Sequence, residues 1–367
     1  MFNYLIAWYR RYFSDPQAAL MVVLLVVSLI VVLTMGEMLA PLLAAIILAY
    51  LLEGPIVRLE RYGARRIVAM NIVFLTFMAF MFFLVLGLMP ILWRQLAEFL
   101  QELPRMINNG QDLLLRLPEL YPQILSEDQV GGFINAVRSG ITNIGTNFLS
   151  LSLTTIPVAI TVLVYLFLVP IMVFFFLKDK HQILAWLSRF LPRERRMVND
   201  VWEEMDAQMG NYVRGKVYEI IIVGAAAYIL FMVTGLSYAP LLAVLVGMSV
   251  LIPYIGAATA TVPVALVAYF QWGFGTEFTT LVVAYFILQF LDGNVLVPIL
   301  FSEANNLHPN AIIVAILVFG GLWGFWGIFF AIPLATLVKA LINAWPTTAQ
   351  DDKPAGESEP VSEDSAN

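Results

Sequence analysis

Asp292 is the acidic residue of this chain best placed to do chemistry inside a membrane. It lies within an apolar run, directly before Gly293 and Asn294, and Pro298 follows shortly after. A charge at the centre of a bilayer costs about 2.5–3.5 kcal/mol on insertion scales, so such an acid needs a reason to be there. Because a proline frees a backbone carbonyl, that carbonyl could join a cation or hydroxyl site. We interpret Asp292 and Asn294 as candidates for ion or proton coupling, with a structural capping or ion-pair role as the alternative.

The other acids in or beside apolar runs have simpler explanations. Glu37, Glu53 and Glu277 fall at predicted ends of membrane spans, where water can solvate a carboxylate. Glu219 follows Lys216 by three residues, a spacing that places two side chains together on one helical face. A structural ion pair at the membrane surface therefore competes with a functional role for Glu219.

Two apolar runs in the last third of the chain are interrupted by helix-breaking residues. The run 240–266 contains a Pro-Tyr-Ile-Gly sequence at its middle, and the run 309–341 contains a cluster of glycines. Each arm of the first run would rise only about 20 Å at about 1.5 Å per residue, too short to cross a hydrocarbon core of about 30 Å comfortably. We therefore predict that 240–271 and 309–343 are each a broken or re-entrant pair of short helices.

The residues at these breaks are candidates to line a substrate path. Backbone groups freed at membrane depth are tolerated only against protein or a water-filled cavity, and paired broken segments are typical of transport sites. The candidate path residues are Pro253, Tyr254, Gly256, Gly320, Gly321, Gly324, Trp323 and Trp326. Close helix packing is the alternative role for the glycines, and anchoring at the membrane interface is the alternative for the tryptophans.

The composition explains why these breaks must be considered at membrane depth. Of the 367 residues, 60% are hydrophobic and 13% are charged, whereas soluble domains carry about 25% charged residues. The apolar residues come in runs of roughly twenty, which is the length of a membrane-spanning helix. We predict an all-α polytopic helical membrane protein with about six full spans and two broken or re-entrant helix pairs, or about eight membrane segments.

Charge runs and prolines divide the chain into regions. The expected regions are an interfacial N-terminal helix (1–16), transmembrane spans one to three (17–92), an extracytoplasmic helical region (93–150), span four (151–177), a cytoplasmic helical region (178–216), a transmembrane bundle with broken helices (217–345) and a disordered acidic tail (346–367). The first two spans, 18–36 and 38–52, are expected to form a tight hairpin at Gly36 and Glu37. Span three should be broken late by Pro90, and the cytoplasmic region should divide into two helices near Pro192.

The distribution of basic residues predicts the orientation. Most of the 20 Lys and Arg residues fall in the N-terminus, in 53–66, in 178–216 and in the tail, and Arg94, Arg105, Arg116 and Arg138 fall in the region expected outside. The positive-inside rule therefore favours both termini in the cytoplasm.

The residue inventory excludes several classes of protein. With no cysteine, disulfides, thiolate catalysis and iron–sulfur ligation are excluded. The two histidines, His181 and His308, lie in polar stretches and cannot form a zinc motif. No nucleotide-binding loop or nucleophile motif occurs in a suitable context, which argues against an enzyme or an ATP-driven pump. The net charge of −6 owes much to the acidic tail, so no nucleic-acid partner is expected, and no cofactor or metal is predicted.

Six segments of the chain have distinctive sequences. They are WYRRYFSDP near the N-terminus, FFFLKDK (174–180), NYVRGK (211–216), VLIPYIGA (250–257), LDGNVLVPILFSEANNLHP (291–309) and FGGLWGFWGIFFAIPLATLVKA (319–340). Together these segments resemble the autoinducer-2 exporter family of permeases. The resemblance covers about 3–346. The family motif positions that match are Arg214, Gly215, Pro253, Tyr254, Gly256, Asp292, Asn294, Pro298, His308, Pro309, Gly320, Gly324 and Pro333. Of these, Arg214, Gly215, Pro298, Pro309 and Pro333 are expected to be structural.

The resemblance implies a multi-pass permease of the bacterial plasma (inner) membrane. The family's characterised members export autoinducer-2 or exchange sodium for protons, and they are thought to be homo-oligomers, with a pentamer as one expected size. The expected partners are the lipid bilayer and a small polar solute or monovalent cation. Three functions stay open: export of a small polar solute, sodium/proton antiport, and a non-transport membrane scaffold. The helix breaks argue against a scaffold, which needs no irregular backbone in lipid.

Overall fold

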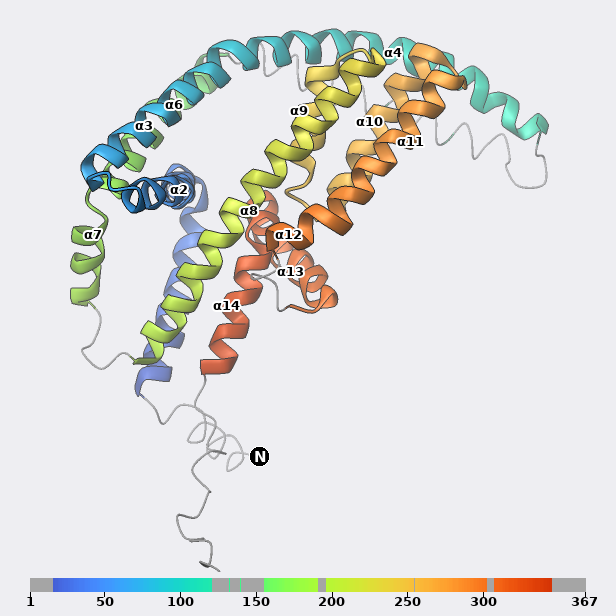
Figure 1. Cartoon of the computed structure of the whole chain (residues 1–367). Coiled ribbons are helices and arrows are strands. Elements are labelled where there is room, and N and C mark those ends of the chain that lie inside the picture. Colours follow the sequence, from blue (N-terminus) through green and yellow to red (C-terminus); the bar gives the residue numbers. More distant parts are fainter. Residues whose placement is uncertain are drawn as a thin grey trace, which may run out of the picture.

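The structure, a computed structural model, describes residues 16–120, 132, 139, 155–190, 196–253, 255–301 and 307–344. Within these ranges all regular structure is helical (Figure 1). Five of the helices described there are long and apolar enough to cross a membrane. The protein is therefore an all-α polytopic membrane protein, as the composition predicts.

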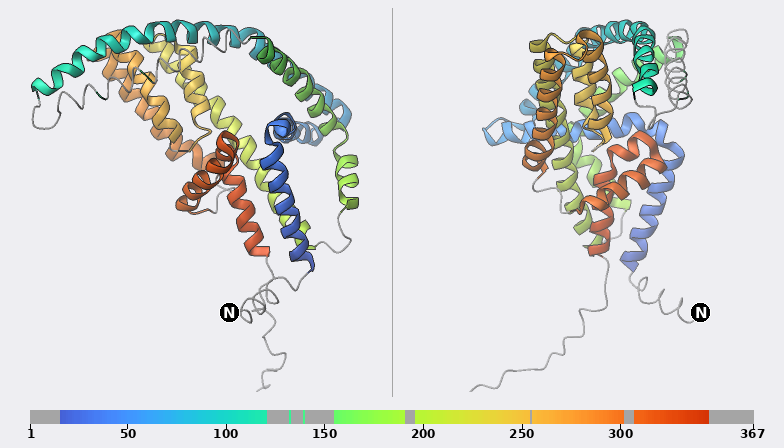
Figure 2. Two further views of the ribbon diagram at one scale, coloured as in Figure 1. Left: turned by 180° about the vertical axis from the view of Figure 1, so that it is seen from behind. Right: turned by 90° about the vertical axis from the view of Figure 1, so that its right-hand side faces the viewer.

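The first described helix contradicts the expected hairpin of spans one and two. Helix α2 (Pro16–Arg61) runs through Gly36 and Glu37 as a single helix of 46 residues, with Pro41 and Pro55 inside it. Figures 1 and 2 show that α2 bends sharply between two arms. The predicted hairpin at Gly36 and Glu37 is wrong because glycine and proline in an apolar helix bend it without ending it when neighbouring helices support the backbone.

A continuous arch follows α2. Helix α3 (Arg66–Phe82), the π-helical turn η1 (Phe83–Leu88) and α4 (Met89–Leu120) follow one another directly, and α4 lies across the outer ends of α9, α10 and α11 (Figures 1 and 2). Pro90 does not break the chain here. Its missing N–H would have bonded the carbonyl of Leu86, which lies inside η1, so the widened turn accommodates the proline.

The next helices join the predicted cytoplasmic region to the membrane bundle. Helix α6 (Thr155–Lys178) is followed by α7 (Lys180–Leu187), the short 3₁₀ turn η2 (Ser188–Phe190) and then α8 (Arg196–Thr234). Pro192 lies outside the described residues, but helices stand on both sides of it. The cytoplasmic region is expected to end at 216 and the transmembrane bundle to begin at 217. Because α8 is one helix of 39 residues, this boundary falls inside a continuous helix.

The first interrupted run forms two helices, as predicted. Helix α9 (Ala239–Ser249) leads inward from the turn after α8, and α10 (Ile255–Trp272) returns to the same end of the molecule (Figure 1). Helix α11 (Thr276–Leu291), the π-helical turn η3 (Asp292–Leu296) and α12 (Val297–Phe301) then run back. The pair α9–α10 is therefore a helical hairpin within the bundle.

Two glycines allow this hairpin to pack closely. A Cβ atom on Gly247 of α9 would lie 3.0 Å from the Cα of Gly224 and 3.0 Å from the carbonyl oxygen of Ile220, both on α8. A Cβ atom on Gly256 of α10 would overlap the carbonyl oxygen of Ser249, at the end of α9. Small residues at these points let the backbones approach, which is how helices gain packing energy in a bilayer.

The second interrupted run is also a pair of helices, α13 (Pro309–Phe329) and α14 (Ala331–Ala344). Within α13, Gly324 has φ 58° and ψ −134°, a conformation that residues with a side chain rarely adopt, and the helix turns there. The glycine-rich sequence therefore does break this run, and the prediction of a helix pair over 309–343 is confirmed.

The outer helix α4 is hydrogen-bonded to the start of the α9–α10 hairpin. Gln95 Oε1 accepts a hydrogen bond from the backbone N–H of Leu241 at 3.0 Å, which caps the first turn of α9. The hydroxyl of Tyr238, just before α9, donates to Glu102 Oε2 at 2.9 Å. Burial, together with this bond to Glu102, raises the pKa of Tyr238 to about 12, so the hydroxyl keeps its proton at neutral pH. The expected extracytoplasmic region thus contributes directly to the hairpin.

Replacing Gly256 with alanine should lower the stability of the protein by about 1–3 kcal/mol, because the new methyl group forces α9 and α10 apart. Thermal unfolding of the purified protein in detergent measures this effect. Gly321→Ala is the control, since a Cβ there would meet nothing within 4 Å. Equal melting temperatures for the two variants would contradict the close approach at Gly256.

Candidate transport site

A cavity of about 380 Å³ lies beside the break between α9 and α10. Its polar lining comes from α8, α11 and η3, and its remaining lining is mostly apolar. The residues that line it are Lys216, Glu219, Val250, Ile252, Pro253, Ala257, Gln289, Asp292, Gly293, Val297, Phe301, Ile312 and Ile332. Three charged side chains, two from α8 and one from η3, therefore share one space within the helical bundle.

Lys216 and Glu219 form a buried ion pair in this cavity. Lys216 Nζ lies 2.7 Å from Glu219 Oε2, and the two side chains are only 6% and 3% exposed. The ammonium also donates to the carbonyl oxygen of Val250 at 2.9 Å. That carbonyl follows the end of α9, so Lys216 satisfies an acceptor in the hairpin break. The sequence spacing correctly indicated the pair, although the pair is buried and does not lie at the surface.

Asp292 is the third charged group of the cavity. It begins the π-helical turn η3, a type of turn that often marks functional sites. Its Oδ1 is buried and has no hydrogen-bond partner among the described residues. A buried oxygen without a partner is costly, so it is suited to receive a proton, a cation or a hydroxyl donor. With one lysine and two acids, the ionised cavity carries an excess negative charge.

Gln289 adds an amide to the same cavity, and the sequence reasoning missed it. Its Nε2 donates to the hydroxyl of Tyr285 at 2.8 Å. Gln289 stands three residues before Asp292, which is the spacing of side chains on one helical face, and this signal could have identified it. The sequence could not show that α8 brings Lys216 and Glu219 to the same point.

Not every residue predicted at the first break reaches the cavity. Pro253 lines it, and Gly256 supports it through the close contact of α10 with α9. Asn294 is exposed, and its side-chain amide donates to the carbonyl of Phe290 at 2.9 Å, so the structure does not bring it to Asp292. Pro298 is likewise exposed, and Tyr254 lies outside the described residues.

The candidate residues of the second break lie away from this cavity. Gly320, Gly321, Gly324, Trp323 and Trp326 are all absent from its lining. Trp323 packs toward α2, where a Cβ on Gly36 would lie 3.2 Å from its Nε1. Trp326 stacks on Phe330, with ring centroids 6.3 Å apart. Helices α13 and α14 supply Ile312 and Ile332 to the cavity wall instead.

Two residues of the NYVRGK segment pack α8 against its neighbours. A Cβ on Gly215 would lie 2.7 Å from the ring of Phe301, so this glycine lets α12 approach α8 near Lys216. Arg214 points to the other side, where it lies against Gly54 of α2 and donates to Asn211 Oδ1 at 2.9 Å. Both residues therefore take part in packing between helices.

The second break begins with a helix cap. His308 is exposed, and its Nδ1 accepts from the backbone N–H of Asn310 at 3.2 Å, directly before α13. Pro309 occupies the first turn of α13, where the missing N–H costs nothing, and Pro333 is buried in the first turn of α14. These positions shape the ends of helices.

The chain matches a known family along nearly its whole length. The model of the protein family described as AI-2E family transporter matches residues 19–347. This match includes α8, both broken helix pairs and every residue that lines the cavity. It confirms the resemblance that the six sequence segments indicate.

Relatives extend across several bacteria. The chain is 49% identical over 346 residues to the protein named PerM in Escherichia coli (strain K12), covering 94% of this chain and 98% of that protein. It is 27% identical over 307 residues to YueF of Bacillus subtilis (strain 168), covering 82% of each chain. It is 24% identical over 313 residues to the AI-2 transport protein TqsA of Escherichia coli (strain K12), covering 84% of this chain and 86% of that protein.

Replacing Lys216 with methionine should destabilise the protein by about 3–5 kcal/mol, because Glu219 would remain as a buried charge without a partner. Removing both charges, in the double variant Lys216→Met and Glu219→Gln, should recover part of that loss, so a double-mutant cycle measures the coupling. Arg94→Gln is the control, since the exposed pair of Arg94 with Glu98 should contribute less than about 1 kcal/mol. Additive effects of the two substitutions would contradict the buried pair.

Proposed function

The chain belongs to the AI-2E transporter family, and from that premise we propose that it moves a small polar solute across the bacterial inner membrane through the cavity beside the α9–α10 break. Members of this family are transport proteins, so the protein is a membrane transporter and not an enzyme. The solute and the route through the protein are the parts that we propose.

The observation that carries this proposal is the cavity lined by Lys216, Glu219, Asp292 and Gln289. Its volume of about 380 Å³ falls within the range of about 300–1,000 Å³ that small-molecule sites occupy. A positive group, acidic groups and an amide in one space can donate to and accept from a solute that carries several hydroxyl groups. Apolar walls around those groups favour a compact solute over an extended one.

The solute to test first is autoinducer-2 or its precursor. One relative is named as an AI-2 transport protein, and the sequence motifs resemble those of exporters of this signal. At 24% identity that name does not fix the solute of this chain, because transport specificity depends on individual residues in the site. The cavity supports the broader class, a small polar solute.

Sodium/proton antiport is the second candidate function. It is favoured by Asp292 Oδ1, which is buried and has no partner among the described residues. A carboxylate of this kind can alternate between binding a proton and binding a monovalent cation. The size of the cavity favours a solute instead, because a bare cation needs only a few oxygen ligands. A scaffold function would leave a polar cavity at the helix break without a role.

The family resemblance also implies a location in the inner membrane and an assembly of several copies of the chain. The starts of α2 and α8 and the end of α14 lie at the same end of the molecule, opposite α4 (Figures 1 and 2). The positive-inside rule supports a cytoplasmic position for that end. We propose a homo-oligomer in the inner membrane, with a pentamer as one size to test by mass measurement in detergent.

Flux assays in proteoliposomes test the two candidate functions side by side. Uptake or release of the autoinducer-2 precursor should exceed that of empty vesicles, while sodium movement under an imposed pH gradient should not. Sodium exchange without solute flux would favour the antiporter. The absence of both from correctly inserted protein would overturn transport through this cavity.

Asp292→Asn should abolish the pH dependence of transport while leaving folding and membrane insertion nearly unchanged, because the substitution keeps the shape of the side chain and removes its ability to ionise. Flux measured over a series of pH values tests this. Glu277→Gln is the control, since Glu277 lies in the first turn of α11, away from the cavity. If transport by a stably inserted Asp292→Asn protein still varied with pH as in the wild type, Asp292 would not be the coupling residue.

Ala257→Phe should reduce solute flux about tenfold or more, because the ring fills space that the solute would occupy. A solute that can bind only by displacing this ring loses at least about 1.4 kcal/mol of binding free energy, which corresponds to a factor of ten in affinity. Ala258→Phe is a matched control, since Ala258 is exposed on α10 and does not line the cavity. Equal flux through the two variants would show that the solute does not pass this cavity.

A further inference from the structure

Away from the transport site, a groove of about 350 Å³ lies between α2, the end of α6, α7 and α8. Most of its lining is aliphatic or aromatic, and its charged lining includes both acidic and basic side chains. The residues that line it are Leu42, Ile46, Ala49, Tyr50, Glu53, Phe176, Leu177, Lys180, Ile183, Leu184, Leu187, Trp202 and Asp206. The groove is therefore amphipathic, with a long apolar wall and charged groups beside it.

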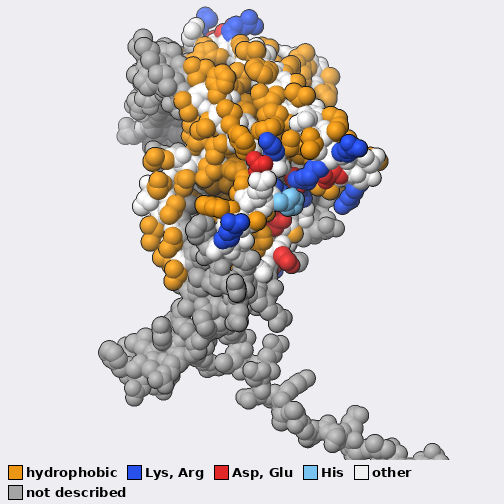
Figure 3. All heavy atoms as spheres, turned by 90° about the vertical axis from the view of Figure 1, so that its left-hand side faces the viewer, with side chains coloured by type: hydrophobic (Ala, Val, Ile, Leu, Met, Phe, Trp, Pro, Cys, Tyr) orange, Lys and Arg blue, Asp and Glu red, His pale blue; other side chains and the backbone are white. Residues whose placement is uncertain are grey.

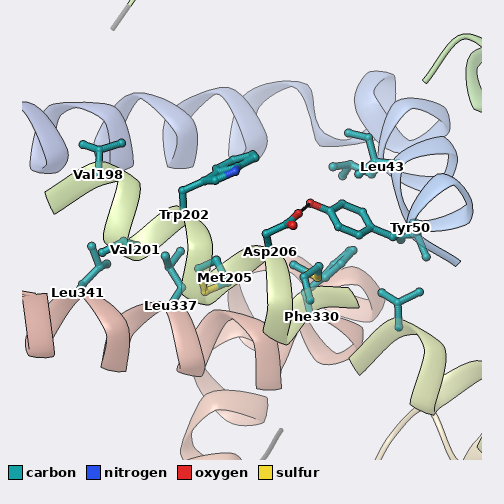
Figure 4. Close-up of a pocket in the computed structure, with 14 residues that line it drawn as sticks. Leu43, Tyr50, Val198, Val201, Trp202, Met205, Asp206, Phe330, Leu337 and Leu341 are labelled. Atoms are coloured by element: carbon teal, nitrogen blue, oxygen red, sulfur yellow. Dashed lines mark hydrogen bonds between the residues drawn. The ribbon is translucent and has the colours of Figure 1, made fainter. Parts of the chain in front are cut away.

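A second apolar cavity of about 470 Å³, between α2, α8 and α14, adjoins this groove. Figure 4 shows its lining, in which Tyr50 of α2 reaches toward Asp206 of α8 and Trp202 points toward α2. The Tyr50 hydroxyl donates to the Asp206 carboxylate. Both spaces share Ile46, Tyr50, Trp202 and Asp206, so the hydrogen bond between Tyr50 and Asp206 lies where the groove and the second cavity adjoin.

The charged end of the groove belongs to a network that joins three helices. Glu53 of α2 accepts from Arg66 of α3 at 3.1 Å and from Lys180 of α7 at 3.3 Å. Arg66 also lies 3.5 Å from Glu60. The two carboxylates of this network are therefore already neutralised by Arg66 and Lys180.

Further basic residues surround this network without a carboxylate partner. Arg58 and Arg61 in the last turn of α2, Arg65 just before α3 and Lys178 at the end of α6 are all exposed. In the ranges that the structure describes, none of them lies within 4.0 Å of an acidic side chain. Figure 3 shows basic side chains gathered at the edge of a broad apolar face. Asp206 in the groove and Asp179 beside Lys178 also form no ion pair in the described ranges, so four basic residues without a carboxylate partner stand against two acids and leave positive charge for an anion.

We propose that the groove binds an anionic phospholipid, with one acyl chain along α2 and α7 and the phosphate beside the basic residues. The apolar wall matches the chain, and the excess of positive charge matches the headgroup. Exposed Leu184 and Leu187 on α7 continue the apolar wall outward, so the second acyl chain can remain in the bilayer. A soluble anion would use only the basic residues, and a neutral lipid would use only the apolar wall.

The binding of lipids to the purified full-length protein tests this proposal. Delipidated protein in detergent is titrated with phosphatidylglycerol, with phosphatidylcholine, and with glycerol 3-phosphate as a headgroup without chains. Native mass spectrometry counts the bound lipid, and the melting temperature reports its effect. Phosphatidylglycerol should bind and raise the melting temperature, whereas the other two should do neither at the same concentration.

Two sets of variants locate the site. Arg61→Gln with Arg65→Gln should weaken phosphatidylglycerol binding about thirtyfold, since each basic residue near an anionic membrane surface contributes about a factor of five. Ala49→Phe should block the acyl chain by filling the groove. The matched controls are Arg94→Gln with Arg105→Gln on α4, and Ala79→Phe on the exposed face of α3. Both controls should bind as the wild type does.

If Ala49→Phe fails to fold, Leu184→Trp fills the groove from its other wall and takes its place. Wild-type affinity in both the charge and the groove variants would overturn the proposal. Equal binding of phosphatidylcholine would overturn the role of the basic residues, and binding of glycerol 3-phosphate alone would overturn the role of the groove. The test requires no transport activity, so its result is independent of the proposed function.

Discussion

The arrangement of the membrane bundle depends on the interactions of one buried group, the ammonium of Lys216. An amine in a region of low dielectric is stable only when its charge and its hydrogen bonds are satisfied. Here the Glu219 carboxylate supplies the charge, and the Val250 carbonyl supplies a second acceptor. Because that carbonyl is available only where α9 has ended, the ion pair and the helix break stabilise each other. The cavity lies at the point where they meet, and Asp292 completes its charged lining.

Close contacts between backbones make this geometry possible. Gly247 lies against Gly224, and Gly256 lies against the end of α9, so the α9–α10 hairpin packs on α8 with little space between the helices. In lipid, where apolar side chains gain little from leaving their surroundings, such close packing supplies much of the energy of helix association. The same proximity positions Lys216 of α8 within reach of the hairpin. Packing and polar bonding therefore act together at this site.

Local sequence signals predicted much of this fold. The prolines and glycines near 253 and 324 predicted two helix pairs, since the arm lengths followed directly from residue counts. Asp292 could be singled out because an acid within an apolar run is rare. The hairpin predicted at Gly36 was wrong, since a glycine and an acid do not by themselves require a turn, and α2 continues through them. The spacing of Lys216 and Glu219 indicated their ion pair, but the position of Asp292 beside that pair could not be predicted, because it depends on how α8 packs against η3.

The capping of α9 by Gln95 has a mechanical consequence. The outer end of the α9–α10 hairpin is tied to α4 by the Gln95 bond to Leu241 and the Tyr238 bond to Glu102. A shift of α9 along its own axis would therefore either break both bonds or drag α4 with it. Since α4 is continuous with η1 and α3, the arch and the hairpin are mechanically linked, and a displacement of α9 would be transmitted through α4 toward α3.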